Sequence, residues 1–120
     1  KSNRKLAEKI VQAGGCLISE YPNGTRPQKY TFVQRDRIQA MLSNKVFIVD
    51  AEKDGGTMHT ADYAAKYAKP LGCFVESDGT ESPAGNQMLV DSHRASAVRN
   101  TEALIDFAGQ PDYAQMSLFV

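Results

Sequence analysis

Apolar residues recur along this chain with two alternating periods, which predict helices and strands in turn. Helical spacing, with apolar residues three and four apart, is found in residues 6–13, 38–42, 57–68, 83–91 and 101–107. Short apolar runs typical of strands lie between them, at residues 16–19, 46–49, 72–75 and 95–98. Strands that alternate with helices of about ten residues form βαβ units. The pattern therefore predicts an α/β fold, a three-layer Rossmann-like parallel sheet flanked by helices.

One domain accounts for most of the chain. With 120 residues, of which 42% are hydrophobic, the chain can bury one core but not two. The alternation stops at Gly109, so we expect a domain over residues 1–109 and a tail over residues 110–120. No run approaches the roughly 18 apolar residues of a membrane span, and residues 1–10 lack a signal-peptide core. We expect a soluble, cytoplasmic protein that binds no membrane.

Two cysteines, Cys16 and Cys73, lie in apolar runs and are expected to be buried free thiols. Together with His59 and His93 they lack the spacing of a metal site, so no metal or other cofactor is expected. The two histidines are expected at the surface or in helix packing. An acidic run, Asp50, Glu52, Asp54 and Asp62, is expected to be solvated rather than to bind magnesium, because no P-loop lysine motif accompanies it.

Charge is distributed unevenly along the chain. Residues 1–45 hold nine Lys and Arg against three carboxylates, a net charge of +6, so the remainder carries −6 because the whole chain is neutral. Such asymmetry is typical of a local basic footprint on a neutral protein, although charged helix faces can also produce it. The basic residues are densest between Arg26 and Arg37.

This basic stretch also carries aromatic rings. Arg26, Lys29, Arg35 and Arg37 fall within twelve positions that also hold Tyr30 and Phe32, and Asp36 is the only acidic residue among them. Cations neutralise phosphates and flat rings stack on bases, so the combination indicates a surface for a nucleic-acid strand. An isolated phenylalanine at this position would more often open a helix and join the core.

The predicted sheet places further candidates at one edge. Ligands of open parallel sheets bind beyond the carboxyl ends of the strands, which here lead into residues 20–31, 51–56 and 76–82. The turn Gly55-Gly56-Thr57 can direct backbone N–H groups at an anion from a helix start, although paired glycines more often serve only as a tight connection. With Lys53 beside it, this turn is expected to hold phosphates opposite the basic stretch.

Three motifs in order resemble the DNA-processing protein A (DprA/Smf) family. Residues 18–42, ISEYPNGTRPQKYTFVQRDRIQAML, follow the family run SEYPxGTxPxxxxFPxRNRIIxGLS. Residues 50–64, DAEKDGGTMHTADYA, follow EAxxxSGSLITAxxA, and residues 85–90, GNQMLV, follow GxNxLI. Three motifs at matching spacing are far more specific than one. The resemblance covers about residues 3–107.

The resemblance implies a recombination mediator that is not an enzyme. Such a protein binds single-stranded DNA without base-edge specificity, protects it, and helps to load a RecA-type recombinase, as a homodimer. It also implies roles for individual residues: Lys29 would contact phosphate, Phe32 would stack on a base, and Arg35 and Arg37 would add backbone contacts. On a helix, these two arginines point about 200° apart and cannot share a phosphate. One of them is expected to be structural, with Asp36 or Glu20 as its partner, and Arg35 is the better DNA candidate.

Two departures from the family pattern bear on affinity. A proline is lost and Asp36 stands in place of an amide in Phe32-Val33-Gln34-Arg35-Asp36-Arg37. Family members also carry, ahead of the matching region, a strand and a glycine-rich loop with a DNA-holding arginine, which this sequence lacks. A fragment or a short, divergent member would show this pattern, and in either case DNA binding weaker than the family's is expected.

The tail suggests a separate partner. Gln115, Met116, Ser117, Leu118 and Phe119 resemble the short peptide by which many bacterial replication and repair proteins dock on the sliding clamp. Packing of these residues on their own domain is the alternative.

A second function stays open for the domain. Related Rossmann folds bind nucleotides or cleave the N-glycosidic bond of nucleoside monophosphates, using a PGGxGTxxE-like loop. This chain has DGGTMHTA there, with no acidic residue until Asp62.

Overall fold

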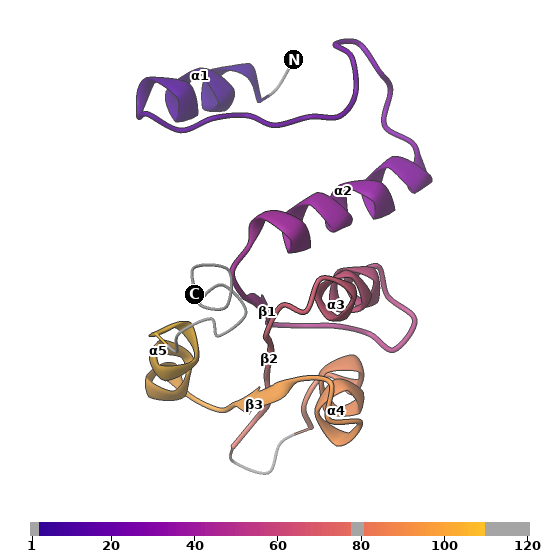
Figure 1. The fold of residues 1–120 in the computed structure, drawn as a ribbon, viewed down its shortest axis with the longest axis vertical. Coiled ribbons are helices and arrows are strands. Elements are labelled where there is room, and N and C mark those ends of the chain that lie inside the picture. The colour runs from indigo at the N-terminus through magenta and orange to yellow at the C-terminus, as the bar shows by residue number, and fades with distance from the viewer. Residues whose placement is uncertain (1–2, 78–80, 110–120) are drawn as a thin grey trace, which may run out of the picture.

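A computed structural model of the chain describes residues 3–77 and 81–109. These residues form the helices α1 (Arg4–Gln12), α2 (Lys29–Leu42), α3 (Thr57–Lys66), α4 (Ala84–Asp91) and α5 (Thr101–Gly109). The strands β1 (Val46–Ile48), β2 (Leu71–Phe74) and β3 (Ser96–Val98) form a parallel sheet in the order β1-β2-β3. Figure 1 shows α3 and α4 on one side of the sheet and α5 on the other. The predicted α/β class with a Rossmann-like parallel sheet is confirmed.

The core lies between the sheet and the α3–α4 layer. Ile48 and Cys73 are buried in the strands, and Leu89 of α4 is fully buried against them. The alanines Ala40 in α2 and Ala61 in α3 are fully buried as well, because a small side chain allows two helices to approach closely. Burial also raises the pKa of the Cys73 thiol to about 11.

A glycine and an asparagine at the start of α4 join the carboxyl ends of β1 and β2. A Cβ atom on Gly85 would lie 2.6 Å from the carbonyl oxygen of Ala51, so only glycine fits this approach. The Nδ2 group of Asn86 donates to the carbonyl oxygens of Val49 (2.9 Å) and Phe74 (2.8 Å). These contacts explain why the glycine–asparagine pair in residues 85–90 belongs to the fold.

The strand expected at residues 16–19 is not formed, and its prediction was wrong. Leu17 and Ile18 are 61% and 63% exposed, and no strand within residues 3–77 and 81–109 pairs with them. An extended segment becomes a strand only when a neighbour accepts its backbone hydrogen bonds. Cys16 is consequently exposed, which corrects its expected burial, although both cysteines are free as predicted.

The first helix is confirmed but stands apart from the sheet. α1 has no buried residue, and Leu6 is 58% exposed. Figure 1 shows α1 and the segment after it separated from the sheet, with α2 between them. The expectation that residues 46–49 are buried on both faces is also only partly met, since Val49 is 64% exposed. It lies past the end of β1, at the margin of the face that α5 covers.

None of the helices in the described part of the chain combines the length and hydropathy needed to cross a bilayer.

Candidate nucleic-acid interface

The basic stretch belongs to a helix rather than to a loop. At its start, the backbone N–H of Gln28 donates to Thr31 Oγ1 (3.1 Å), and the backbone N–H of Thr31 donates to the Gln28 carbonyl oxygen (3.0 Å). This reciprocal pair begins α2 at Lys29, nine residues before the apolar spacing at Ile38. Lys29, Phe32, Arg35 and Arg37 therefore project from one rigid element, and only Arg26 lies in the preceding loop.

Two side-chain contacts hold the segment before α2 against the helix. The hydroxyl of Tyr21 donates to Gln34 Oε1, and the guanidinium of Arg37 forms an ion pair with Glu20. Because both partners are on α2, residues 20 and 21 are positioned beside the helix. A small cavity forms where this segment meets the first turns of α2.

This cavity, the α2 cavity, has a volume of about 200 Å³. That is smaller than the pockets of about 300–1,000 Å³ that enclose drug-sized ligands, so it suits one planar group rather than a whole nucleotide. It combines two cations with an aromatic ring and small polar side chains. The lining residues are Tyr21, Thr25, Arg26, Pro27, Thr31, Phe32 and Arg35.

Phe32 is accessible at this cavity and carries an arginine on its ring. The side chain is 50% exposed, and the guanidinium carbon of Arg35 lies 5.3 Å from the ring centroid. Arg35 Nη2 also lies 3.4 Å from Asp36 Oδ1. A cation above an aromatic ring offers both a stacking surface and a charge for a phosphate.

Arg37 is engaged within the fold. The hydrogen bond with Glu20 is the main cause that raises the pKa of the Arg37 guanidinium, and the Tyr67 side chain adds to it. The arginine side chain is 31% exposed, against 55% for Arg35. The expectation that one of the two arginines is structural, with Glu20 as its partner, is confirmed.

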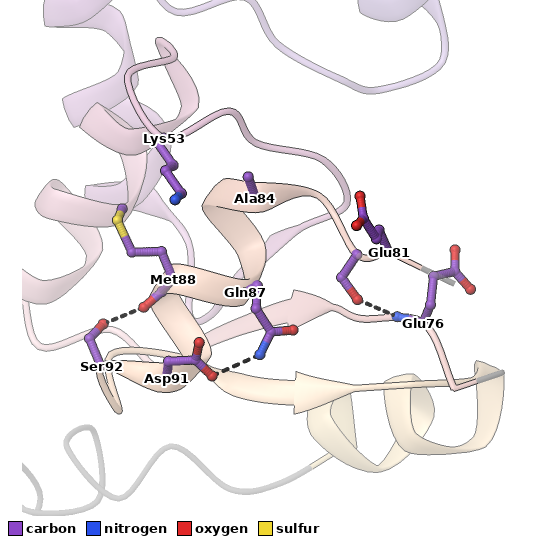
Figure 2. Close-up of a pocket in the computed structure, with 9 residues that line it drawn as sticks. Lys53, Glu76, Glu81, Ala84, Gln87, Met88, Asp91 and Ser92 are labelled. Atoms are coloured by element: carbon purple, nitrogen blue, oxygen red, sulfur yellow. Dashed lines mark hydrogen bonds between the residues drawn. The ribbon is translucent and has the colours of Figure 1, made fainter. Parts of the chain in front are cut away.

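Lys53 lies in a different and larger cavity at the carboxyl edge of the sheet. This cavity, the carboxyl-edge cavity, has a volume of about 820 Å³ and is lined by Lys53 and the carboxylates of Glu76, Glu81 and Asp91, among others. Figure 2 shows Lys53 reaching from the β1–α3 loop toward α4, with Glu76 and Glu81 on the β2–α4 connection. Three carboxylates around one lysine disfavour a phosphate.

The glycine turn beside Lys53 keeps part of its predicted anion-binding capacity. The Gly55 N–H donates to the Glu52 carbonyl oxygen (3.1 Å), whereas the start of α3 at Thr57 leaves the N–H groups of Gly56 and Thr57 outside the contacts of the described residues. Gly56 has ordinary helical backbone angles, so it opens α3 without strain. A negative charge at this helix start would be favoured only if the neighbouring carboxylates were kept away.

The structure does not bring the two groups of candidate residues into one cavity. The α2 cavity holds Arg26, Phe32 and Arg35, the carboxyl-edge cavity holds Lys53, and the two share no lining residue. The predicted common edge required a strand before residues 20–31, and that strand is not formed. The residues around the α2 cavity are therefore the better nucleic-acid surface.

Two lining residues were missed by the sequence interpretation. Tyr21 and Thr25 come from the segment that folds over α2, and their position depends on the contacts of Glu20 and Tyr21 with the helix. Hydroxyls near a basic stretch were the only pattern that could have indicated them. In the described residues no group of three or more His, Cys, Asp or Glu side chains could hold a metal ion, and Asp62 pairs with Arg94 instead.

Comparison with known proteins agrees with these motifs. A sequence model of the family described as DNA recombination-mediator protein A matches residues 1–109. The chain belongs to this family. The Smf protein of Synechocystis is 29% identical over 109 residues, which cover 91% of this chain and 27% of that protein. The DprA protein of Bacillus subtilis is 28% identical over 107 residues, covering 88% of this chain and 35% of the relative.

Solved structures of family members share the fold. DNA processing protein A from Helicobacter pylori, whose structure describes a single-stranded DNA binding mode, is 33% identical with a TM-score of 0.65, covering 73% of this chain and 40% of that one. DprA from Streptococcus pneumoniae is 25% identical with a TM-score of 0.70, covering 88% and 37%. The chain thus spans well under half of these family members.

Proposed function

We propose that this chain binds single-stranded DNA through the α2 cavity and its surroundings, without base-edge specificity. It acts by binding rather than by catalysis, as a mediator that protects the strand and loads a RecA-type recombinase. A base stacks on Phe32, while Arg26, Lys29 and Arg35 neutralise the flanking phosphates. Lys53, Gly55, Gly56 and Thr57 take a minor part, because carboxylates surround them.

One observation carries this proposal. Phe32 is half exposed on a rigid helix, with Arg35 over its ring and Arg26 in the same cavity. An exposed phenylalanine contributes nothing to the core, so the position favours a ligand that covers the ring. Stacking on an aromatic ring is tolerant of base identity, which agrees with binding that does not depend on sequence.

Fluorescence anisotropy with labelled oligothymidine at several salt concentrations tests the assignment. Phe32→Ala should weaken binding by about 1–3 kcal/mol with an unchanged salt slope, because a base loses its stacking partner. Lys29→Ala should instead flatten the salt slope by about 1. Tyr30→Ala is the matched control, since Tyr30 is 59% exposed but does not line the cavity. Wild-type binding by both Phe32→Ala and Lys29→Ala would refute the proposed surface.

A nucleoside monophosphate used as competitor separates the second function. A nucleotide-binding or N-glycosidase-like protein would release oligothymidine when the monophosphate is added, and Lys53→Ala would remove that competition. Strand binding that the monophosphate cannot displace supports the DNA-binding function.

Further partners belong to the same proposal. Family membership supports a RecA-type recombinase and a homodimer, and Ile105 of α5, 65% exposed, offers an apolar contact for a second copy. Sedimentation of the wild type and of Ile105→Asp tests the dimer. A shift from dimer to monomer in the variant is expected, whereas a monomeric wild type would exclude it.

The clamp-binding peptide predicted at Gln115, Met116, Leu118 and Phe119 lies outside the described residues. We retain it as a proposal on its sequence pattern. Deletion of residues 115–120 should abolish co-elution with a bacterial sliding clamp while oligothymidine binding persists. Unchanged co-elution would exclude a clamp-binding role.

A further inference from the structure

A second basic cavity lies at the amino edge of the sheet, where β2 and β3 begin. This amino-edge cavity has a volume of about 530 Å³. Three of its lining side chains are basic, Lys69, His93 and Arg94, and none is a carboxylate. The rest are apolar or neutral: Pro70, Leu71, Val90, Ala95 and Ser96.

The backbone fixes the corners from which these side chains project. Ala68 (φ 51°) and His93 (φ 57°) adopt the left-handed conformation, which residues other than glycine rarely adopt. The Lys69 N–H donates to the Ala64 carbonyl oxygen (2.8 Å), and the Arg94 N–H donates to that of Leu89 (2.9 Å). Each turn is thereby closed onto the helix before it, so the cavity's walls are rigid.

The cations of this cavity are only partly neutralised. Arg94 Nη2 lies 2.5 Å from Asp62 Oδ1 on α3, an ion pair with 36% and 61% of the two side chains exposed. Among the described residues, the side chains of Lys69 and His93 make no ion pair or hydrogen bond. A lysine supplies a point charge, and an imidazole can donate an N–H to a phosphate oxygen in either protonation state.

A basic path connects this cavity with α2. Arg37 interacts with the Tyr67 side chain at the end of α3, and Lys69 follows two residues later. The opposite edge of the sheet differs, because Glu76, Glu81 and Asp91 surround its cavity. A polyanion that leaves the α2 surface is therefore attracted toward the amino edge and repelled from the carboxyl edge.

We propose that the amino-edge cavity is a second phosphate-binding site for a single DNA strand already held on α2. This inference rests on the proposed function. Lys69 and His93 contact phosphates, and Arg94, oriented by Asp62, completes the site. A strand that reaches only the α2 cavity does not use it, whereas a longer strand uses both.

Cations after helix ends also have a structural use, since they complement the negative end of the helix dipole. Lys69 and His93 follow α3 and α4, so this explanation makes a different prediction. It requires loss of thermal stability without any change in DNA binding when they are replaced.

The test compares two lengths of labelled oligothymidine, about 6 and about 20 nucleotides, which cover one site or both. The variant Lys69→Gln/His93→Asn removes the two unpaired basic groups, and asparagine tolerates the left-handed backbone at residue 93. Its affinity for the longer strand should fall about 5-fold and its salt slope by about 1, while the short strand binds as before. Lys9→Gln on α1 is the control for loss of a positive charge away from the cavity.

The outcomes separate the two proposals. Equal binding of both strands by wild type and double variant would overturn the second site and leave the α2 surface intact. So would an equal loss for both lengths, or a lowered melting temperature with unchanged binding. If the double variant lost only the binding of a polyglutamate peptide, the cavity would serve an acidic protein segment instead. Absence of strand binding by the wild type would overturn both proposals.

Discussion

At the scale of single residues, Arg35 and Arg37 show how near neighbours acquire different tasks. Both were candidates for DNA, and the helix directs them to different surroundings. Glu20 engages Arg37, whereas Arg35 lies over Phe32 and near Asp36. The free face of α2 thus belongs to Phe32 and Arg35.

Asp36 is expected to weaken strand binding. Its carboxylate lies 3.4 Å from Arg35 Nη2, and its side chain is only 13% exposed, so it partly neutralises the arginine. Asp36→Asn should strengthen oligothymidine binding by roughly 0.5–1 kcal/mol, the scale of one charge pair near a surface. The salt slope should steepen by about 0.7, as for one more phosphate contact on a single strand.

Anisotropy at several salt concentrations measures both effects. Asp91→Asn, on α4 away from the α2 cavity, removes the same charge and serves as the control. Equal gains in the two variants would show that only net charge matters, and the specific effect of Asp36 would be disproved.

At the scale of elements, the start of α4 is the joint between the sheet and its loops. Asn86 is fully buried, and its amide bonds two carbonyl oxygens that follow β1 and end β2. Its Oδ1 atom has no hydrogen-bond partner among the described residues, so the side chain is retained for its two donated bonds. Both carboxyl-edge loops depend on this residue.

Asn86→Ala should lower the free energy of unfolding by about 1–3 kcal/mol, because two buried carbonyl groups lose their donor. Gln87→Ala, one position along on the exposed side of α4, should change it by less than about 0.5 kcal/mol. Urea unfolding followed by circular dichroism compares the two. A similar loss in both variants would mean that helix propensity, and not the buried bonds, sets the effect.

At the scale of the whole molecule, the described chain divides into a packed body and an exposed amino-terminal part. β1 to α5 bury their apolar residues against one another, while α1 buries none. The contacts of Glu20 and Tyr21 with α2 connect the two parts. Stability is therefore expected to reside in the body.

One substitution made at two places tests this division. Leu89→Ala in the core should cost about 2–5 kcal/mol of unfolding free energy, because it leaves a cavity at a fully buried site. Leu6→Ala removes the same atoms from a residue that is 58% exposed, and should cost less than about 0.5 kcal/mol. Thermal and urea unfolding measure both, and a comparable loss for Leu6→Ala would show that α1 packs in solution.

The sequence by itself determined the alternation of elements. α3, α4 and α5 and the three strands lie within two residues of the ranges predicted from apolar spacing, because that spacing is a local property of the chain. The start of α2 was missed by nine residues, since a polar cap at Gln28 and Thr31 begins it and apolar spacing does not. The candidate residues of α2 were likewise visible in the sequence, as cations and rings within twelve positions.

Only the tertiary structure decided which of these residues meet. It leaves residues 16–19 without a neighbouring strand, places Lys53 among carboxylates, and engages Arg37 with Glu20. It also gathers Lys69, His93 and Arg94, which are 24 or more positions apart across β2 and α4, into one cavity. Hydrogen bonding, burial and electrostatic fields act between segments that are distant along the chain, so no local pattern could predict them.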